Sequence, residues 1–566
     1  MTNFAYLGPS QDSEEALLEH LFLSDYPTLA VDVETVSLKD RTLIGIGISP
    51  NPNEAFYFPV LPEPSAYLDS IWELLEDTPK LKVFHNAIFD LGVLDIEPGR
   101  FADTSIMLQM QALPLRLADT VGQYLGVEIK EISDILPARK TMLDVPVEVV
   151  AEKCLHDTLY THKLFEQMGG RKWLDKANGH TWTYQFHSSV WQDMSEPTSY
   201  YVSPEMKDCY DVDIRLIPLL LRMSKRGLAL RKDRVEEWYE ELSKEKLFYQ
   251  DICTQYGFNP GSNQQVGYTL AERGNILPFT RSRRQLKVDE DVLLALDDPL
   301  ARVVLQYRKK DKLLGTYIKP WRGEERAYTN FRLDLGTGRL ASYDRNLQNV
   351  PKPVRDIFEP DSGVWTWWDH NQIEMRMFAY ITQDPMMLKA YREGSDIHTV
   401  TQISLWPGSD LNDETLRVRV KGFNFSMIFY AQVETISRNS GLPLVACKKF
   451  REEWLDLYEV AADYMVRQME GTGPTQTIYG RKQRMPGLDT ATPAHIAKCR
   501  INYPVQGSAA DVVKRAMLRC QEMDLVVQVH DEVLVDGDED IPEELEWIHP
   551  EVHTPFKVKI GPVWSG

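Results

Sequence analysis

Hydrophobic positions change their spacing from one region of the chain to the next. In the first 165 residues, short apolar runs alternate with helical stretches, which is typical of an α/β domain. The runs YPTLAVDVET (26–35) and LKVFH (81–85) are predicted strands. Apolar positions then recur with helical spacing over 211–325, and strands return afterwards around a long helical block at about 372–470. The pattern therefore predicts a multidomain α/β protein.

A polar, aromatic stretch at 170–205 separates the first region from the rest and is the best linker candidate. The 566 residues allow about three or four domains at roughly 150 residues each. Hydrophobic residues make up 43% of the chain, which is enough for several cores and excludes wholesale disorder.

The sequence lacks the signals of secretion and of membrane insertion. Residues 1–38 contain no Lys or Arg, which argues against a signal peptide, and no apolar run approaches roughly 18 residues. The six cysteines are far apart and include no C-x-x-C pair, so we expect neither a disulfide framework nor a zinc ribbon. These features predict a large cytoplasmic protein with no membrane contact.

Charge is distributed unevenly along the chain. The 63 basic and 84 acidic residues give a net charge of −21, which by itself argues against nucleic acid as a partner. However, residues 301–345 hold eleven Lys or Arg against five Asp or Glu, and basic clusters occur at 281–287 and 479–484. Residues 536–551, in contrast, hold eight acids and no Lys or Arg. Because such runs are usually solvated faces, a nucleic-acid surface is one of two interpretations.

Four acidic residues near the amino terminus are candidate metal ligands. Asp32 and Glu34 lie two positions apart at the end of a predicted strand, so both side chains project from one face, about 6.5–7 Å apart. Asn86 is a predicted helix N-cap with Asp90 on the following turns, and Asp157 lies on a further helix. Four such carboxylates could hold two Mg²⁺ ions and activate a water for phosphodiester cleavage. The spacing alone also fits four unrelated surface or capping acids.

A second acidic pair occurs in the carboxy-terminal half. Asp369 ends the aromatic run WTWWD, and LVVQVHDEVLVD predicts a tight hairpin with Asp531 and Glu532 at its tip. On neighbouring strands, Asp369 and Asp531 could hold two Mg²⁺ ions about 3.5–4 Å apart, as in-line phosphoryl transfer requires. A single carboxylate at a strand end is otherwise commonly a turn former.

A helix between these acids carries cations and rings in line. Arg417, Lys421, Phe425 and Phe429 recur every four residues, so they remain near one helix face. Charge for phosphates and aromatic surface for a sugar and base suit a nucleoside triphosphate. An amphipathic packing helix explains the same pattern equally well.

A loop punctuated by Gly and Pro, GTGRLASYDRNLQNVP (336–351), precedes the aromatic strand. It offers side chains that suit sequence-independent contacts to a nucleic-acid backbone and minor groove. The candidate contact residues are Arg339, Asn346, Gln348 and Asn349.

The amino-terminal motifs DVET and HNAIFD and the helix with Asp157 resemble the three motifs of the DEDD-type 3′→5′ proofreading exonucleases. The resemblance implies that Asp32, Glu34, Asp90 and Asp157 are the metal ligands. The family usually places Tyr four residues before the last Asp, or His five before it, and this chain has Lys153 and Glu152 there. His156 or Tyr160 could then orient the attacking water.

The carboxy-terminal motifs closely resemble those of family A DNA polymerases, the group that contains bacterial DNA polymerase I and many phage replicative enzymes. DHNQIEMR is similar to motif A, RVRVKGFNF to motif B and QVHDE to motif C. TGRLAS…NLQNVP, GSDIHT, YGRKQRMP and INYPVQGSAADVVKRAM are similar to further family blocks in the same order. The two resemblances together cover about 30–165 and 210–565.

The resemblance implies a role for each matching residue. Asp369 and Asp531 hold the metals with Glu532 nearby, Arg417 and Lys421 contact the triphosphate, and Lys421 protonates the leaving pyrophosphate. Glu374 excludes a ribose 2′-OH, and Phe425 in place of Tyr implies discrimination against dideoxynucleotides. The remaining implied contacts are Gln372 and Phe429 for the nucleotide, and Gln506, Arg339 and His530 for the primer-template.

Two pairs depart from the family pattern. Motif A usually has Tyr-Ser where this chain has His370-Asn371, and the motif B helix usually ends Tyr-Gly where this chain has Phe429-Tyr430. We expect the missing Gly to alter the hinge at the helix end. We also expect no 5′-nuclease domain, because the first residue is close to the exonuclease strand.

The implied fold is a ribonuclease H-like exonuclease domain followed by a right-hand polymerase domain. The predicted divisions are 1–185 for the exonuclease-like domain, 186–210 for the linker, 211–325 for the thumb and start of the palm, 326–371 for the palm, 372–500 for the fingers and 501–566 for the palm with motif C.

The resulting functional hypothesis is a template-directed DNA polymerase with a proofreading exonuclease, acting as a monomer in phage DNA replication. Its partners are primer-template DNA and deoxynucleoside triphosphates, with a helicase, primase or single-strand binding protein as further candidates. Mg²⁺ is the expected cofactor, and Mn²⁺ has the same oxygen-ligand preference. The main alternative is a repair or translesion polymerase with a weak or inactive exonuclease, because the motif tyrosine is missing. A single-subunit RNA polymerase and a nuclease with a vestigial polymerase half are further alternatives, disfavoured by Glu374 and by intact Asp369, Lys421 and Asp531.

Overall fold

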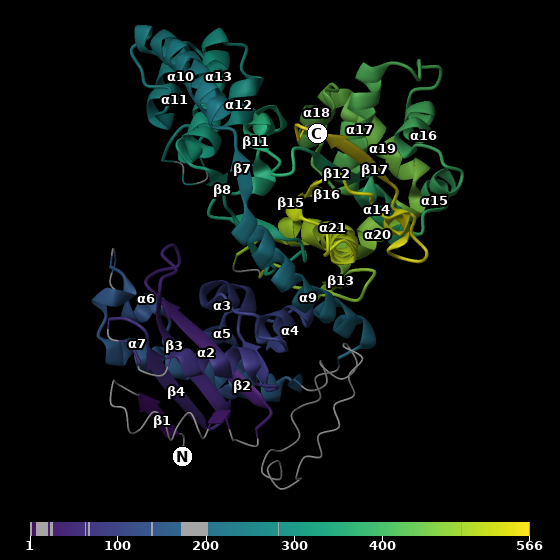
Figure 1. Cartoon of the computed structure of the whole chain (residues 1–566). Helices are drawn as coiled ribbons and strands as arrows, with labels where there is room; N and C mark the ends of the chain where they lie inside the picture. Colours follow the sequence, from purple (N-terminus) through teal and green to yellow (C-terminus); the bar gives the residue numbers. More distant parts are fainter. Residues whose placement is uncertain are drawn as a thin grey trace.

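The computed structural model has an amino-terminal α/β domain below a larger body with two helical lobes (Figure 1). The structure describes residues 3–6, 21–22, 26–62, 64–65, 68–136, 138, 140–170, 202–280, 282, 284–487 and 490–564. Within these residues no helix combines the length and hydropathy needed to cross a membrane.

The amino-terminal domain is built on a sheet with the strand order β1-β4-β3-β2-β5-β6. Val, Thr and Leu residues favour the extended conformation of the central strand β2, which is buried because β3 and β5 flank it and the helices α3 and α7 contact it. Both strands predicted here are confirmed as β2 and β5. The strands are β1 (Asn3–Tyr6), β2 (Thr28–Thr35), β3 (Leu43–Asn51), β4 (Glu54–Pro59), β5 (Leu81–Phe84) and β6 (Phe101–Asp103).

Helix α7 packs closely against β3 and β2. The approach requires a glycine at position 47, because a Cβ there would lie 2.2 Å from Thr158 Oγ1 and 2.8 Å from Cys154 Sγ. The helices of this domain are α2 (Leu68–Asp77), α3 (Ala87–Leu94), α4 (Thr104–Met110), α5 (Leu117–Leu125), α6 (Ile132–Ile135) and α7 (Val147–Gln167).

The predicted capping of α3 by the Asn86 side chain is wrong. Asn86 has φ +84° and makes no side-chain cap hydrogen bond. Instead, the carboxylate of Asp103 accepts hydrogen bonds from the backbone N–H groups of Asn86 (3.1 Å) and Ala87 (2.7 Å). The cap therefore comes from the end of β6, which is adjacent to β5 in the sheet.

Helix α9 (Pro204–Arg226) joins the two parts of the molecule (Figure 1). The hydroxyl of Tyr210 on this helix accepts a hydrogen bond from the backbone N–H of Asp103. Buried residues of the helix such as Leu216 belong to an apolar cluster that also contains Val83 of the amino-terminal domain and Phe378 of the body. Residues 186–201 of the predicted linker lie outside the described residues, and 204–210 are helical rather than linker. The remaining boundaries stay predictions.

The larger body is mostly helical, as the apolar periodicity predicts. Figure 1 shows helices α10–α13 in one lobe and α15–α19 in the other. The helices are α10 (Lys232–Gln255), α11 (Asn263–Glu272), α12 (Glu290–Ala295), α13 (Pro299–Lys312), α14 (Ile373–Thr382), α15 (Pro385–Arg392), α16 (Ile397–Leu405), α17 (Glu414–Ile428), α18 (Val433–Ser440), α19 (Leu444–Leu457), α20 (Glu459–Glu470) and α21 (Pro493–Arg519).

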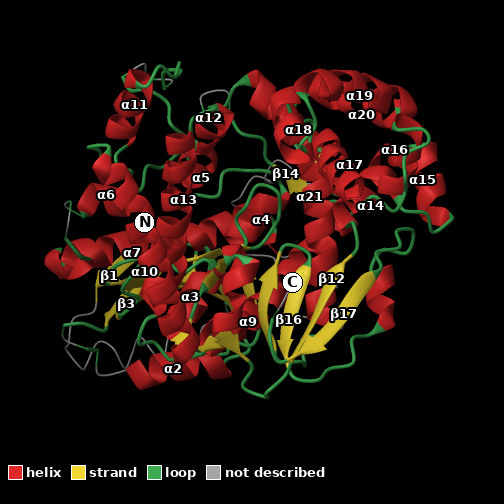
Figure 2. Cartoon of the chain, turned by 90° about the horizontal axis from the view of Figure 1, so that it is seen from above, coloured by secondary structure: helices red, strands yellow, loops and turns green. Residues whose placement is uncertain are grey.

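A four-stranded sheet with the order β15-β16-β12-β17 lies between the lobes, and Figure 2 shows β16, β12 and β17 side by side. The predicted hairpin is confirmed, since His530 and Asp531 form the turn between β15 and β16. The strands of the body are β7 (Leu228–Leu230), β8 (Arg326–Ala327), β9 (Asn330–Arg332), β10 (Ala341–Tyr343), β11 (Phe358–Glu359), β12 (Trp365–His370), β13 (Thr475–Gln476), β14 (Lys482–Gln483), β15 (Leu525–Val529), β16 (Glu532–Asp536) and β17 (Phe556–Gly561).

A histidine buried under the amino-terminal sheet makes its stability pH-dependent. His162 on α7 is fully buried, and its Nδ1 lies 3.0 Å from the Ser49 carbonyl oxygen. A carbonyl only accepts, so Nδ1–H donates and Nε2 accepts from the Thr28 hydroxyl at 2.9 Å. Burial lowers the pKa of His162 to about 4.

We expect the folded protein to lose stability as the pH falls, because it holds His162 in the neutral form. Between pH 6.5 and 4 the unfolded chain binds the proton and the folded chain does not, so unfolding is favoured by up to about 3 kcal/mol. In His162→Gln the unfolding midpoint should therefore fall less between pH 7 and 5 than in the wild type. Replacing the exposed His495 by Gln is the matched control. Parallel pH curves for the wild type and His162→Gln would contradict the assignment.

Candidate active sites

Two carboxylates meet where β12 ends beside the hairpin turn. Asp369 lies between β16 and β17, opposite Glu532 and Lys557, and its side chain is exposed. The next residue, His370, donates its backbone N–H to the Asp531 carbonyl at 3.3 Å, which fixes the turn against β12. Burial and then the charge of Asp369 raise the pKa of the Asp531 carboxyl to about 7. A cation bound between the two carboxylates would relieve this repulsion.

Glu532 lies in a strand and not at the tip of the hairpin. It is the first residue of β16 and is buried. Its Oε1 accepts hydrogen bonds from Arg355 Nη1 and Trp564 Nε1, both at 2.9 Å. The prediction that it projects from the tip is therefore wrong, and its carboxylate neutralises a buried guanidinium that stacks on the Trp564 ring.

A cavity of about 460 Å³ brings many of the predicted residues together. Glu374 and Phe425 line it from α14 and α17, and the Arg339 guanidinium pairs with the Glu374 carboxylate. Burial raises the pKa of Glu374, although the charge of Arg339 opposes this shift. The predicted residues that line the cavity are Arg339, Asn346, Gln348, Asn349, Glu374, Phe425, His530 and Asp531.

The loop amides are held in place by hydrogen bonds. Gln348 Oε1 accepts from the Ser342 N–H, and its Nε2 donates to Gln528 Oε1, both at 2.8 Å. Asn346 Oδ1 accepts from the Ser342 hydroxyl at 2.8 Å. These contacts order the amide groups at the cavity wall before any ligand binds.

Asp396 connects three of the predicted nucleotide contacts and was not among the predicted site residues. It accepts a hydrogen bond from Gln372 Nε2 at 2.8 Å and pairs with the Arg417 guanidinium. Gln372 has φ +54° at the start of α14, and its Oε1 also accepts from the Tyr391 hydroxyl at 3.3 Å. The motif GSDIHT contains Asp396 and was the available sequence signal.

Lys421 and Phe425 occupy the exposed side of α17, in agreement with the helical spacing. The Lys421 ammonium is exposed and lies 6.0 Å from the centroid of the Phe425 ring. His398 lies behind this ring at a centroid distance of 5.8 Å, and its Nδ1 accepts from Asn424 Nδ2 at 3.0 Å. Burial is the main cause that lowers the pKa of His398 to about 4, and the charges of Lys421 and Arg417 act in the same direction. This imidazole is therefore neutral near pH 7.

The end of α17 shows the consequence of the missing glycine. Phe429 caps the helix, and its carbonyl accepts a hydrogen bond from Asn502 Nδ2 at 3.3 Å. Tyr430 has φ +49°, a left-handed conformation that a glycine adopts without steric cost. The Arg451 guanidinium lies 5.5 Å from the Tyr430 ring centroid and packs on this turn. The left-handed turn thus has a strained tyrosine in it, and the expected effect on a hinge stays a prediction.

His370 and Asn371, the other unusual pair, anchor the segment before β17. His370 Nδ1 donates to the Thr554 carbonyl at 2.9 Å, and the Asn371 N–H donates to the Pro555 carbonyl at 2.7 Å. Gln506 lies on α21, of which Ala509, Ala510 and Val513 reach the 460 Å³ cavity. Gln506 itself does not line this cavity, and neither do Asp369, Gln372, Arg417, Lys421, Phe429 or Glu532.

The four predicted acids of the amino-terminal domain form one cluster. Asp32 and Glu34 lie on β2, Asp90 on α3 and Asp157 on α7. Burial and then the neighbouring charges raise the pKa values of Asp32 and Asp90, and burial raises that of Glu34. Helix α3, which carries Asp90, contacts strand β2, which carries Asp32 and Glu34.

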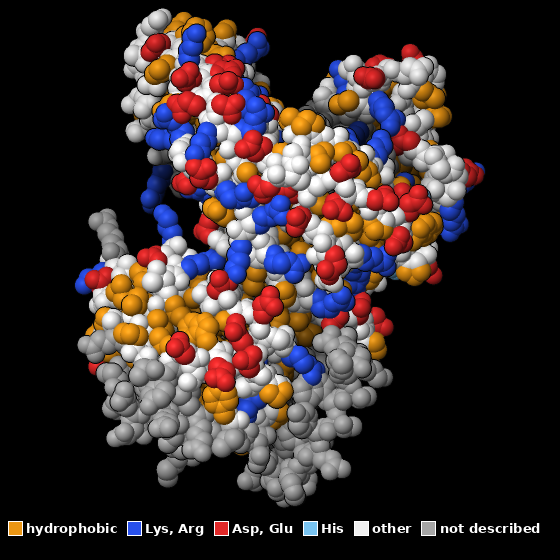
Figure 3. Space-filling model, in the orientation of Figure 1, with side chains coloured by type: hydrophobic (Ala, Val, Ile, Leu, Met, Phe, Trp, Pro, Cys, Tyr) orange, Lys and Arg blue, Asp and Glu red, His pale blue; other side chains and the backbone are white. Residues whose placement is uncertain are grey.

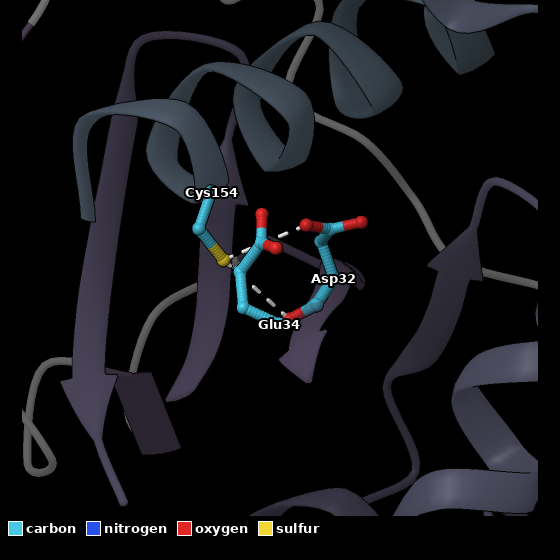
Figure 4. A group of neighbouring side chains, drawn as sticks. All are labelled: Asp32, Glu34 and Cys154. Carbon is cyan, nitrogen blue, oxygen red and sulfur yellow. Dashed lines mark hydrogen bonds between the residues drawn. The ribbon is translucent and has the colours of Figure 1, made fainter. Parts of the chain in front are cut away.

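A lysine lies inside this cluster. Lys153 Nζ donates to Glu34 Oε1 at 2.8 Å and to Asp157 Oδ2 at 2.7 Å. Burial lowers its pKa, but the charges of Glu34 and Asp157 outweigh burial and raise the pKa overall. Cys154 Sγ, the next residue, lies 3.5 Å from Asp32 Oδ2 (Figure 4). His156 and Tyr160, the predicted substitutes for the missing tyrosine, do not line the cavity in front of Asp157.

This second cavity, of about 1470 Å³, lies between the amino-terminal domain and the body. Lys153 and Asp157 line it from one side, and Asn330, Tyr343 and Asn346 from the other. Asn346 lines both this cavity and the 460 Å³ cavity. Figure 3 shows Lys and Arg side chains gathered between the lower domain and the body, and a hollow between the two lobes.

The donor sets fit hard divalent cations, because carboxylate oxygens dominate both clusters. Atoms of Asp32, Glu34 and Cys154 that could bind a metal all lie within 4.8 Å of one another. In the amino-terminal cluster, burial without a full set of cationic partners disfavours the ionised carboxylates, and a bound cation would relieve this.

Comparisons with known proteins agree with this arrangement. The pattern of DNA polymerase family A matches residues 229–560, and that of a 3′-5′ exonuclease matches residues 9–171. DNA polymerase I of Pseudomonas aeruginosa is 27% identical over 579 aligned residues, which cover 93% of this chain and 61% of that protein. DNA polymerase I of Streptococcus pneumoniae serotype 4 is 30% identical, covering 58% of this chain and 41% of that protein. The chain thus spans less than two thirds of the length of these relatives.

A solved structure has the same fold. The POL domain of Pol1 from M. smegmatis, in complex with a DNA primer-template and dNTP, superposes with a TM-score of 0.75 at 19% sequence identity. The match covers 100% of this chain and 99% of that one.

Proposed function

Because this chain belongs to DNA polymerase family A and carries a 3′-5′ exonuclease domain, we propose that it extends a DNA primer on a template and removes 3′-terminal nucleotides at a second site. The observation that carries the proposal is the 460 Å³ cavity, which brings Asp531, Glu374, Phe425 and the loop amides to one wall. Each of these residues comes from a different segment of the chain, and each has the chemistry that its proposed role requires.

The polymerase carboxylates are proposed to bind Mg²⁺. Bound there, divalent cations would neutralise charge on the phosphate oxygens and lower the pKa of the primer 3′-OH. Asp369 and Asp531 would supply the oxygen ligands, while Glu532 neutralises Arg355. Lys421 and Arg417 on α17 are proposed to attract the triphosphate, and Lys421 is proposed to give a proton to the departing pyrophosphate.

Selectivity for the sugar is proposed to come from Glu374 and Phe425. Both line the cavity, and a carboxylate there excludes a ribose 2′-OH by steric contact and desolvation. Gln372, bonded to Asp396, and Phe429, the cap of α17, are proposed as further nucleotide contacts although neither lines the cavity. The primer-template contacts are proposed for Arg339, Asn346, Gln348, Asn349, Gln506 and His530, whose polar groups suit sequence-independent contacts.

The exonuclease is proposed to work at Asp32, Glu34, Asp90 and Asp157. The 1470 Å³ cavity is the proposed path for a primer end, since Asp157 lines it and Asn346 lines both it and the polymerase cavity. We assign the chain to phage DNA replication in the host cytoplasm, with primer-template DNA and deoxynucleotides as ligands. The unusual pairs His370-Asn371 and Phe429-Tyr430 support a divergent replicative enzyme.

One observation favours a second candidate function. The Lys153 ammonium bonds to two of the four exonuclease carboxylates. Because these carboxylates are then less available to a metal, the contact favours a repair or translesion polymerase with a weakened exonuclease. The two functions differ in the rate of primer shortening.

The test uses a 5′-labelled primer on a longer DNA template with Mg²⁺. We expect extension when deoxynucleotides are present and shortening when they are omitted. Asp32→Ala should reduce the rate of primer shortening by at least about 10³-fold and leave the rate of extension unchanged, because several kcal/mol of metal assistance are lost at one site only. Asp40→Ala, at an exposed acid of the same domain, is the matched control.

The outcomes separate the candidates. Extension without shortening in the wild type would support the translesion function. The absence of extension under every condition would refute the polymerase proposal.

A further inference from the structure

Lys153 is built into the exonuclease cluster rather than placed at its edge. Its side chain is 7% exposed, and its ammonium donates to Glu34 and Asp157, two carboxylates that come from different elements. Charge-assisted bonds of 2.8 and 2.7 Å hold it there. An ammonium that bridges two carboxylates occupies the position a shared divalent cation would take between them.

The other two carboxylates are left without such a partner. Within the described part of the chain, neither Asp32 nor Asp90 forms an ion pair within 4.0 Å, and the contact of Asp32 with Cys154 Sγ at 3.5 Å is a weak hydrogen bond (Figure 4). Asp90 is only 3% exposed. The cluster is therefore divided into a pair that shares the Lys153 ammonium, Glu34 with Asp157, and two carboxylates without an ion-pair partner, Asp32 and Asp90.

Lys153 limits how many divalent cations the cluster can accept. Four carboxylates carry a charge of −4, and the ammonium of Lys153 reduces it to −3, so less negative charge remains for cations to balance. A second cation would have to displace Lys153 from Glu34 and Asp157. Displacing the ammonium from these buried carboxylates opposes the binding of two cations.

We propose that the Lys153 ammonium replaces one of the two divalent cations of the exonuclease site, so that the site binds a single cation at Asp32. The inference rests on the proposed exonuclease function and deepens it. The ammonium holds Glu34 and Asp157 in place and supplies the fixed positive charge that a second cation would otherwise bring. Lys153 is thus a positioning residue for these two carboxylates and sets the metal stoichiometry.

The test counts bound Mn²⁺ per chain by electron paramagnetic resonance of the free ion. The full chain is used with Asp369→Asn and Asp531→Asn, so that the polymerase site does not contribute. In this background we expect one tightly bound Mn²⁺ with Lys153 and with Lys153→Arg, and two with Lys153→Met, which has similar length and no charge. Lys163→Met, at a lysine ten residues further along α7, should leave the count at one.

Each result has a defined meaning. Two ions bound with Lys153 intact would overturn the inference, even if Lys153→Met failed to fold. One ion in both the Lys153 and the folded Lys153→Met proteins would also overturn it, because the lysine would then not limit the count. Loss of the single ion in Asp32→Asn would support its assigned place. No tight ion in any variant would overturn both this inference and the proposed exonuclease metal site.

Discussion

Asp531→Asn should reduce primer extension by at least about 10³-fold, because metal assistance worth several kcal/mol depends on this carboxylate. Asn has nearly the same shape but no negative charge, so Asp369 would remain as a single ligand. Primer shortening should be unchanged, since the amino-terminal cluster does not include Asp531. Extension rates on a labelled primer-template, measured under single-turnover conditions, test the expectation.

The same substitution should not lower stability, which separates chemistry from folding. Burial and the charge of Asp369 raise the pKa of Asp531 to about 7, so its ionised form is disfavoured in the folded protein. Removing that charge at pH 8 should leave the metal-free unfolding temperature unchanged or higher. Asp538→Asn, at an exposed acid after the same hairpin, is the control and should retain full extension. Extension within tenfold of wild type for Asp531→Asn would contradict the assignment of this residue.

Asp213→Ala should destabilise the chain by about 3–5 kcal/mol, the usual cost of leaving a buried charge without its partner. Asp213 lies on α9 and is completely buried. Its two oxygens accept from Arg481 Nη1 at 2.6 Å, Arg481 Nη2 at 3.0 Å and Lys514 Nζ at 2.8 Å. Arg481 also donates to Asp511 through Nε at 2.9 Å. Two acids and two bases therefore balance in this cluster.

Asp213→Ala would leave an excess positive charge in the buried cluster between α9 and α21. Helix α9 connects the two parts of the molecule. Although burial opposes it, the charges of Arg481 and Lys514 lower the pKa of Asp213, so its carboxylate is ionised and needed. Asp208→Ala on the same helix removes a surface pair with Arg515 and should cost no more than about 1 kcal/mol. Urea unfolding of the full chain compares the two. A cost for Asp213→Ala within about 1 kcal/mol of Asp208→Ala would show that the buried network does not stabilise the fold.

Local patterns in the sequence predicted elements whose cause is local. The strand with Asp32 and Glu34, the hairpin that places Asp531 in its turn, and the helix with Arg417, Lys421 and Phe425 on one face all follow from spacing over a few residues. Motif order also predicted the family, which the comparisons confirm. These features need no knowledge of which distant segments meet.

The partners of the functional side chains required the tertiary structure. Lys153 bonds to Glu34 across 119 positions, Arg355 to Glu532 across 177 and Arg481 to Asp213 across 268. Similarly, Asp103 rather than Asn86 caps α3, because the sheet order brings the end of β6 beside that helix. Periodicity encodes which face of an element is buried, whereas the pairing of charges depends on how elements pack. The sequence by itself thus determined the two sets of acids and their family, and only the fold decided that a lysine lies in one set and that a buried ion cluster joins α9 to α21.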